Sequence, residues 1–436
     1  MKIYIETLGC PKNVSDSEAA AGILENSGHD IINEISDAEA IIVNTCGFIG
    51  DAKKESIEKI FDAAKIKNDN TLLIVSGCLA QRYQDELYKQ MPEVDIFIGV
   101  NEYKDLPKVI ADYTGKRQKH FSPCEKEYVE MPQRRLHEGI FSATIKIAEG
   151  CDNSCTYCVI PSIRGPYRSR KKENIMEEAE RLAAGGCKEI IIIAQDVTAY
   201  GIDLYGKFEL PSLLKDLCKI ADIRWIRLMY CYEDRITDEL IETMRSEEKI
   251  CKYIDIPIQH CSDKILSAMN RRSTKNSIKS TIGRLREAMP DIHIRTTVIV
   301  GFPGEGNEEF SELFEFIEDV KLERLGVFVY SKEEGTPAAV MKPQVRANTK
   351  ESRKDAIMLR QLDISLEHNT SKIGKTLEVF VEGTDDEGAY YGRSMYDAPE
   401  IDNSVIFTSE RECKIGDIVN VKIVDAFDYD LVGEEG

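Results

Sequence analysis

Residues 149–158 read EGCDNSCTYC and hold three cysteines, Cys151, Cys155 and Cys158, in the spacing C-x3-C-x2-C. The local sequence offers no fourth Cys or His, which a zinc knuckle or a closed four-cysteine cluster would need. Three thiolates on a four-iron cluster would leave one iron free to bind a small molecule. The stretch therefore predicts an iron–sulfur site with an open position, and a zinc site or a chance cluster of cysteines is the alternative.

The composition is that of a globular protein with two or three domains. Of 436 residues, 42% are hydrophobic and 31% are charged, and the formal net charge is −20. This charge argues against broad electrostatic binding to nucleic acid or to an anionic membrane. No apolar run is long enough to span a bilayer, so we expect a cytoplasmic protein whose thirteen cysteines serve as ligands and buried thiols rather than disulfides.

Short apolar runs alternate with helical stretches over residues 1–115, which predicts a parallel sheet with helices on both faces. Ser15 and Glu18 look like a capping box that begins the first helix. The expected strands are 2–7, 40–45, 72–76 and 95–99, and the expected helices are 15–26 and 51–67.

Cysteines follow the first three of these strands: Cys10, Cys46 and Cys78. They are separated by about the length of one βαβ unit. The carboxyl ends of parallel strands meet at one edge of a sheet, where ligands bind, so we expect the three thiols to converge. The prediction is a second three-cysteine site, and three buried core thiols are the alternative.

The rest of the chain predicts a linker and two further domains. Residues 116–136 are rich in charged residues and glutamine and are typical of a linker. Residues 137–368 contain six strands with helices between them, which predicts a partial (β/α)6 barrel with its site at the carboxyl ends of the strands. The expected strands are 142–147, 189–194, 225–230, 253–258, 293–300 and 325–330.

The C-terminal segment, residues 369–436, has strand-like alternation broken by turn residues and predicts a small antiparallel β-barrel. Its charge is strongly acidic: from Lys372 onward about six basic residues face about sixteen acidic ones. An RNA-binding barrel needs basic residues for phosphate contacts. The acidic charge therefore favours a basic partner such as a ribosomal protein.

The motifs together resemble the radical S-adenosylmethionine (SAM) methylthiotransferases, and the likeness covers nearly the whole chain. It rests on the C-x3-C-x2-C loop and on LGCPKN (8–13), NTCGFI (44–49) and SGC (76–78). Within this family the chain looks most like the RimO type, which modifies an aspartate of small-subunit ribosomal protein twelve. The stretches that favour this type include PSIRG (161–165), QDVTAYG (195–201) and DYDLVGE (428–434).

The resemblance implies an N-terminal methylthiotransferase domain, a radical SAM core and a C-terminal TRAM barrel. It also implies two 4Fe–4S clusters, one on Cys151, Cys155 and Cys158 and an auxiliary one on Cys10, Cys46 and Cys78 that binds a sulfur species. One SAM molecule donates a methyl group to this sulfur. A second is cleaved to a radical, which takes hydrogen from the β-carbon of the aspartate before the methylthio group is added; the cofactors supply this hard chemistry. An electron donor is a further implied partner.

Five residues near the expected strand ends could contact SAM: Tyr157, Gln195, Asp196, Gln259 and Gly301. Tyr157 is suited to cover the cluster and touch the adenine, and a glycine permits close approach to the backbone. The alternative for each is packing, turn formation or structural hydrogen bonding. No catalytic residue is assigned beyond the cluster ligands.

Arg164, Arg168 and Arg170 follow the cluster loop and could meet a carboxylate of the substrate or of SAM. A solvated basic surface is the alternative.

Two other functions stay open. A MiaB-type enzyme would use the same clusters to methylthiolate an adenosine in tRNA, so the cysteines do not discriminate between the two substrates. A non-catalytic iron–sulfur carrier or scaffold would explain the thiols but not the barrel or the open cluster positions. Neither a membrane nor a nucleic acid is expected as the main partner, and the ribosomal protein could be modified free or in the ribosome.

Overall fold

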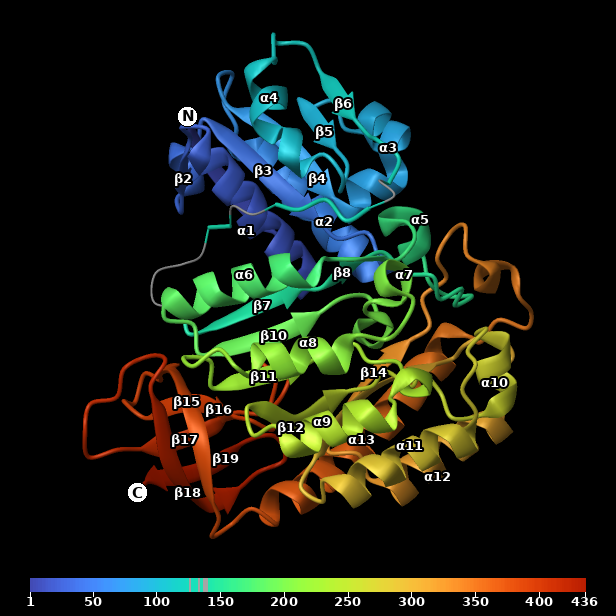
Figure 1. Cartoon of the computed structure of the whole chain (residues 1–436). Helices are drawn as coiled ribbons and strands as arrows, with labels where there is room; N and C mark the ends of the chain where they lie inside the picture. Colours follow the sequence, from blue (N-terminus) through green and yellow to red (C-terminus); the bar gives the residue numbers. More distant parts are fainter. Residues whose placement is uncertain (125–126, 132–133, 136–139) are drawn as a thin grey trace.

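The computed structural model describes residues 1–124, 127–131, 134–135 and 140–436. Three large sheets, the last of them a closed barrel, follow one another along the chain (Figure 1). An N-terminal α/β part sits on a central α/β part, and a small β-barrel packs against the opposite side of the central part. None of the described helices is long and apolar enough to cross a membrane.

The N-terminal sheet has six parallel strands in the order β2-β1-β3-β4-β5-β6. Strands β3 and β4 are buried along their whole length, because each is an apolar run covered on both faces. Strand β6 lies within the segment that the sequence predicts as a linker. The elements are β1 Lys2–Thr7, α1 Pro11–Asn26, β2 Asp30–Ile32, β3 Ala40–Thr45, α2 Gly50–Ile66, β4 Leu72–Gly77, α3 Cys78–Gln90, β5 Ile96–Ile98, α4 Leu106–Ala111 and β6 Gln118–His120.

The predicted start of the first helix is wrong. Helix α1 begins at Pro11, not at Ser15, and Ser15 is buried within the helix rather than capping it. Proline suits the first helical position, because its φ is already helical and its missing N–H would have no partner there. The early start places Cys10 directly at the N-cap.

The central sheet has six parallel strands in the order β14-β13-β12-β11-β10-β7, which confirms the predicted partial barrel. Most of its apolar core lies between the sheet and the surrounding helices. Its strands are β7 Ser142–Lys146, β10 Glu189–Ile193, β11 Trp225–Leu228, β12 Ile250–Asp255, β13 His293–Val300 and β14 Arg324–Val329. Two short strands, β8 Ala148–Glu149 and β9 Arg168–Ser169, form a separate antiparallel pair. The helices are α5 Ile160–Arg164, α6 Lys172–Ala184, α7 Ile202–Tyr205, α8 Leu210–Leu217, α9 Asp238–Ser246, α10 Asp263–Ala268, α11 Lys275–Ala288, α12 Asn307–Val320 and α13 Ala347–Thr370.

The C-terminal strands close into a barrel in the order β15-β16-β17-β19-β18. Its pairs are antiparallel except that β17 runs parallel to β19. The strands are β15 Thr376–Thr384, β16 Tyr390–Ser394, β17 Val405–Thr408, β18 Ile418–Ala426 and β19 Leu431–Glu435.

A buried ion-pair network joins this barrel to the central sheet. The carboxylate of Glu189, at the start of β10, accepts hydrogen bonds from Arg227 on β11 (Nε to Oε1, 2.9 Å) and from Arg393 on β16 (Nη1 to Oε1, 2.9 Å). Beside it, the rings of Trp225 and Phe380 pack edge to face with their centroids 4.3 Å apart. Trp225 is the single tryptophan of the chain and therefore reports on this interface.

This network predicts an acid-sensitive barrel. Burial by itself would raise the pKa of Glu189, but the charges of Arg393 and Arg227 outweigh it and lower the pKa to about 2. The unfolded chain binds this proton near pH 4.5, so the stabilisation is complete above that pH and is lost as the pH falls toward about 2. We expect a loss of about 3 kcal/mol across this window, measured by Trp225 fluorescence during denaturant titrations at each pH.

Glu189→Gln should abolish this pH dependence and destabilise the protein already at neutral pH, because two arginines are left buried without their anion. Glu242→Gln is the control, since Glu242 pairs with Arg245 on the exposed surface. An unchanged acid profile in Glu189→Gln would show that another carboxyl group controls the transition.

Candidate functional site

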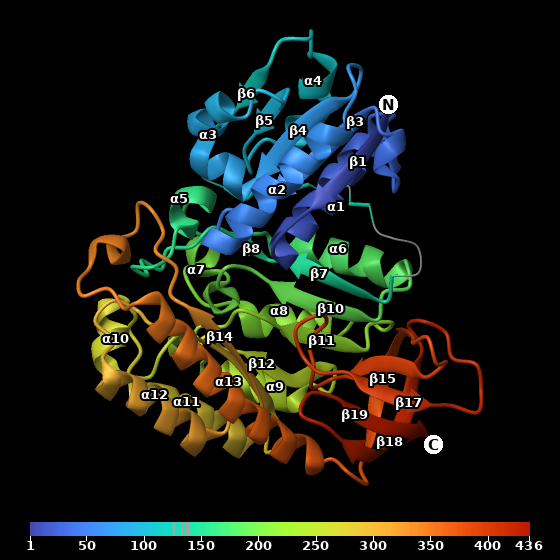
Figure 2. The same ribbon diagram turned by 180° about the vertical axis from the view of Figure 1, so that it is seen from behind.

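The N-terminal part lies on the β7 side of the central part in both views (Figures 1 and 2), and it contacts segments that follow central strands. At the end of β10, Lys12 Nζ donates to the carbonyl oxygen of Ala194 at 3.2 Å and lies 3.5 Å from the ring centre of Tyr230. Beyond β14, Glu333 accepts from Lys53 at 2.8 Å and from Arg82 at 2.7 Å. The N-terminal part therefore contacts segments that follow β10, β11 and β14.

The structure brings Cys10, Cys46 and Cys78 together at the carboxyl edge of the N-terminal sheet. Cys10 follows β1, Cys46 follows β3 and Cys78 begins α3 directly after β4. A methyl group added to Gly9 would lie 2.7 Å from Cys46 Cβ. Burial raises the pKa of Cys46, and it raises the pKa of Cys78 to about 11, with further increases from the neighbouring thiols.

Two residues outside the predicted set build this cysteine site. Asn13 Nδ2 donates to the carbonyl oxygens of Leu8 at 2.8 Å and Thr45 at 3.1 Å, which ties the β1 and β3 loops together. Gly77 has a φ of +93°, and a side chain there would lie 2.5 Å from the Thr45 carbonyl oxygen. Both residues belong to the quoted motifs LGCPKN and SGC, so the motifs carried a signal for them.

Cys151, Cys155 and Cys158 lie in the loop between β8 and α5. Burial raises the pKa of Cys151 to about 11 and that of Cys158 to about 12. The Tyr232 hydroxyl lies 3.3 Å from Cys155 Sγ, and the Ile160 amide donates to Cys158 Sγ at 3.4 Å. The loop thus offers three thiols whose sulfurs already have hydrogen-bond partners.

The donor chemistry of both sites fits iron–sulfur clusters. Each site supplies three thiols, and cluster ligation requires clustered thiolates whose hydrogen bonds and burial tune the potential. Within the described part of the chain, no three His, Cys, Asp or Glu side chains converge as ligands of one metal ion. Cluster thiolates sit on different irons and need not converge on one point.

Among the predicted SAM residues, Gln195 and Asp196 already have protein partners, although Gln195 Oε1 is buried without a hydrogen bond. Gln195 Nε2 donates to Glu149 Oε1 at 2.7 Å, and buried Asp196 pairs with Arg235. Gly301 has a φ of +74°, and its amide donates to a glutamate carboxylate. Gln259 has a φ of +68° and bridges to β13, and Tyr157 is half-buried against an apolar cluster.

A cavity of about 200 Å³ opens beside the Cys155 end of the cluster loop. Asn153, Tyr232, Arg271 and Ser273 are among its lining residues, whereas the five predicted SAM residues are not. Arg271 and Tyr232 have no motif that marks them in the sequence. They come from segments after β12 and β11, and only the fold places them beside the cluster loop.

The arginine run does not form a solvated surface, so that alternative is wrong. Arg164, Arg168 and Arg170 are all buried. Arg170 pairs with Glu130 at 2.8 Å and Glu178 at 2.6 Å. The carboxylates that the run meets belong to the protein itself.

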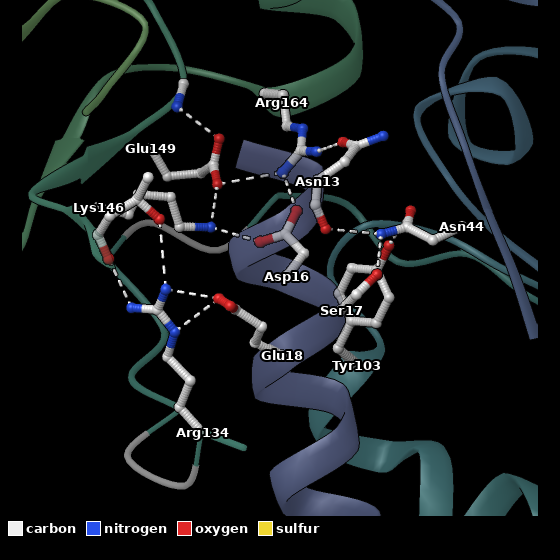
Figure 3. A network of polar contacts seen from close by, with 12 residues as sticks. Asn13, Asp16, Ser17, Glu18, Asn44, Tyr103, Arg134, Lys146, Glu149 and Arg164 are labelled. Atoms are coloured by element: carbon white, nitrogen blue, oxygen red, sulfur yellow. Dashed lines mark hydrogen bonds and ion pairs between the residues drawn. The ribbon is translucent and has the colours of Figure 1, made fainter. Parts of the chain in front are cut away.

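A buried ion-pair network joins helix α1 of the N-terminal part to the beginning of the central part (Figure 3). Asp16 on α1 accepts from Lys146 Nζ at 2.6 Å and from Arg164 Nη1 at 2.7 Å. Glu149 accepts from the same two cations, at 2.7 Å and 3.2 Å. Sequence reasoning missed Asp16 and Lys146, because the two residues that pair here are 130 positions apart in the chain.

Three family models match the chain. They are described as "Uncharacterized protein family UPF0004" at residues 2–99, "Radical SAM superfamily" at 145–317 and "TRAM domain" at 373–435. Among solved structures, the radical SAM methyltransferase TsrM from Kitasatospora setae aligns with a TM-score of 0.57 at 12% identity, over 78% of this chain and 74% of its own. At this identity the likeness concerns the fold alone.

Full-length relatives are much more similar in sequence. Those named "Ribosomal protein uS12 methylthiotransferase RimO" from Acetivibrio thermocellus and from Thermoanaerobacter sp. are each 49% identical. The relative of that name from Caldanaerobacter subterraneus is 50% identical. Each alignment covers 99% of this chain and at least 98% of the relative.

A six-stranded parallel partial barrel with a C-x3-C-x2-C loop at its mouth defines a radical SAM enzyme. The additional N-terminal sheet, the TRAM barrel and the sequence identity of about 50% to full-length relatives specify which kind of radical SAM enzyme this is. The chain belongs to the RimO family of ribosomal protein uS12 methylthiotransferases. It is therefore a radical SAM methylthiotransferase, an enzyme that works with SAM and 4Fe–4S clusters.

Proposed function

We propose that this protein adds a methylthio group to the β-carbon of an aspartate in ribosomal protein uS12. The observation that carries the proposal is a pair of three-cysteine sites in two different parts of the chain, with a cysteine of each in contact with helix α5. The substrate is the one in the names of relatives that are about half identical over their whole length.

Cys151, Cys155 and Cys158 would hold one 4Fe–4S cluster, and Cys10, Cys46 and Cys78 the auxiliary one. When bound, the clusters and SAM supply the radical, methyl and sulfur chemistry that side chains alone lack. The chain contributes the ligands. Burial raises the pKa values of the Cys78, Cys151 and Cys158 thiols, so they stay protonated until ligation displaces the protons. Tyr232 and the Ile160 amide orient the sulfurs of Cys155 and Cys158.

SAM would lie at the carboxyl ends of the central strands, with Tyr157, Gln195, Asp196, Gln259 and Gly301 beside it. These residues follow the strands that surround the cluster loop. Gln195 and Asp196 already bond to other side chains, so their role would be to support the SAM site as well as to contact SAM. Gly301 allows a close approach of its backbone, since it has no Cβ.

The acidic TRAM barrel would receive the basic substrate. Complementary charge raises the rate of encounter and disfavours a polyanion. This argues against tRNA as the substrate, although a MiaB-type enzyme would have the same cysteine sites. An electron donor must reduce the clusters, and uS12 could be modified free or in the ribosome, in the cytoplasm.

Mass spectrometry of uS12 tests this function. In cells that lack the gene we expect unmodified uS12, and in cells that carry it a mass increase of one methylthio group located on an aspartate. Digested tRNA from the same cells is the comparison. An unchanged uS12 mass together with loss of methylthio-adenosine from tRNA would refute the substrate assignment, and SAM that stays uncleaved by reconstituted protein would refute radical catalysis.

A further inference from the structure

Helix α5 contacts a sulfur of each cysteine site. At its first residue, the Ile160 amide donates to Cys158 Sγ at 3.4 Å. At its last residue, Arg164 Nη2 donates to Cys78 Sγ at 3.2 Å. Between these ends, Ile163 is fully buried and packs against Cys78. A single turn of helix therefore separates a ligand of one site from the residue that binds a ligand of the other.

The Arg164 side chain is held rigidly in this position (Figure 3). It is 3% exposed, and its two terminal nitrogens make contacts in addition to the sulfur. Nη1 donates to Asp16 at 2.7 Å and Glu149 at 3.2 Å, and Nη2 donates to Asn13 Oδ1 at 2.8 Å. Planar guanidinium groups favour such fixed multiple contacts, which a lysine ammonium does not reproduce.

Arg164 also carries its charge into the auxiliary site. Its guanidinium forms buried ion pairs with Asp16 at 2.7 Å and with Glu149 at 3.2 Å, which compensate for burying the charge. A cation that donates a hydrogen bond to a ligand sulfur favours the more negative, reduced state of a cluster. In a water-excluded environment this influence is strong.

We propose that α5 sets the spacing between the two clusters and that Arg164 is a positioning residue that binds Cys78 Sγ and raises the reduction potential of the auxiliary cluster. This inference rests on the proposed function, since it takes Cys10, Cys46 and Cys78 as cluster ligands. In this arrangement a residue of the radical SAM core forms a direct hydrogen bond to a ligand of the auxiliary cluster in the N-terminal domain. The same contact explains why the arginine after the cluster loop faces away from the solvent.

The potential of the auxiliary cluster can be measured by itself. In a full chain with Cys151, Cys155 and Cys158 replaced by alanine, only the auxiliary cluster remains, and its midpoint potential follows from an EPR-monitored redox titration. In this background we expect Arg164→Met to shift the potential to a more negative value, and Arg164→Lys to shift it less. Arg134 is the matched control.

Arg134 also bridges the two parts with a mostly buried guanidinium, because it donates to Glu18 on α1 at 2.8 Å and to Glu178 on α6 at 2.9 Å. Its hydrogen bonds to the described residues go to Glu18, Glu178 and Thr144, not to a cysteine. We expect Arg134→Met to leave the auxiliary potential unchanged. If Arg164→Met fails to assemble a cluster, the same titration of Arg164→Lys tests the inference, and a more negative potential than in the parent supports it.

Spacing is tested in the protein with both clusters. Reduction of both should give EPR spectra broadened by their magnetic interaction, and insertion of one alanine between Ser162 and Ile163 should weaken this interaction because it adds a rise of about 1.5 Å. Unchanged potentials in both Arg164 variants, or an unchanged interaction after the insertion, would overturn the inference. Absence of any cluster from the triple-alanine background would instead overturn the assignment of Cys10, Cys46 and Cys78.

Discussion

Replacement of Cys10, Cys46 and Cys78 by alanine is expected to abolish methylthio transfer and to leave reductive cleavage of SAM intact. The three thiols come from one sheet, and the C-x3-C-x2-C loop comes from another. Loss of the first set therefore leaves the second set with its own ligands and hydrogen bonds. The measurements are iron and sulfide content, which should fall by half, and the formation of 5′-deoxyadenosine and methylthiolated uS12.

The reciprocal variant supplies the control. With Cys151, Cys155 and Cys158 replaced by alanine, half of the iron should remain, while SAM cleavage and methylthio transfer should both fall below detection. Replacement of Cys187, which is buried in the central core, should leave the iron content unchanged. If either triple variant lost all its iron, the two sites would not be independent and the two-cluster assignment would fail.

Asp16→Leu is expected to give a large loss of stability at the interface between the two sites. Asp16 is 1% exposed and neutralises Lys146 and Arg164 together. Its removal leaves two buried cations with the single anion Glu149, and breaking a buried pair in this way costs about 3–5 kcal/mol. Denaturant titration of the reconstituted protein measures the loss, and hydrogen exchange should locate it in α1 and α5.

Two further variants serve as controls. Asp16→Asn tests the charge at constant side-chain volume, and Asp85→Asn tests the loss of an exposed ion pair. Asp16→Asn keeps the volume but loses the charge, so it should also be strongly destabilised. Asp85 pairs with Lys119 on the exposed surface, and its substitution should leave the denaturation midpoint unchanged. If Asp16→Leu were as stable as the parent, the hydrophobic replacement would compensate for the pair, and the network would hold the domains by geometry rather than by energy.

Much of the fold could be predicted, because it rests on local patterns. The six strands of the central sheet were expected close to where they occur, since each is an apolar run bounded by turn residues. The beginning of α1 could not be predicted from capping chemistry. Ser15 and Glu18 have the spacing of a capping box, but Pro11 starts the helix one turn earlier.

The candidate site was predictable in part. Cysteines at strand ends are a periodic signal, and the structure brings Cys10, Cys46 and Cys78 to one edge as expected. The Arg164 contacts had no such signal. The buried ion pair between Asp16 and Arg164 produces no repeating pattern in the sequence. Each of these residues, taken alone, is of a type that is usually exposed to solvent.

The sequence by itself determined which residues supply thiols, where the longer strands lie and which family the chain resembles, because these depend on patterns along one chain. It did not indicate the short strands β2 and β6. Only the tertiary structure decided that α5 lies between the two cysteine sites and that Asp16, Lys146, Glu149 and Arg164 neutralise one another there. The reason is physical: a charged side chain is stable in a buried interface only when its partner is present, and that partner comes from a different sheet.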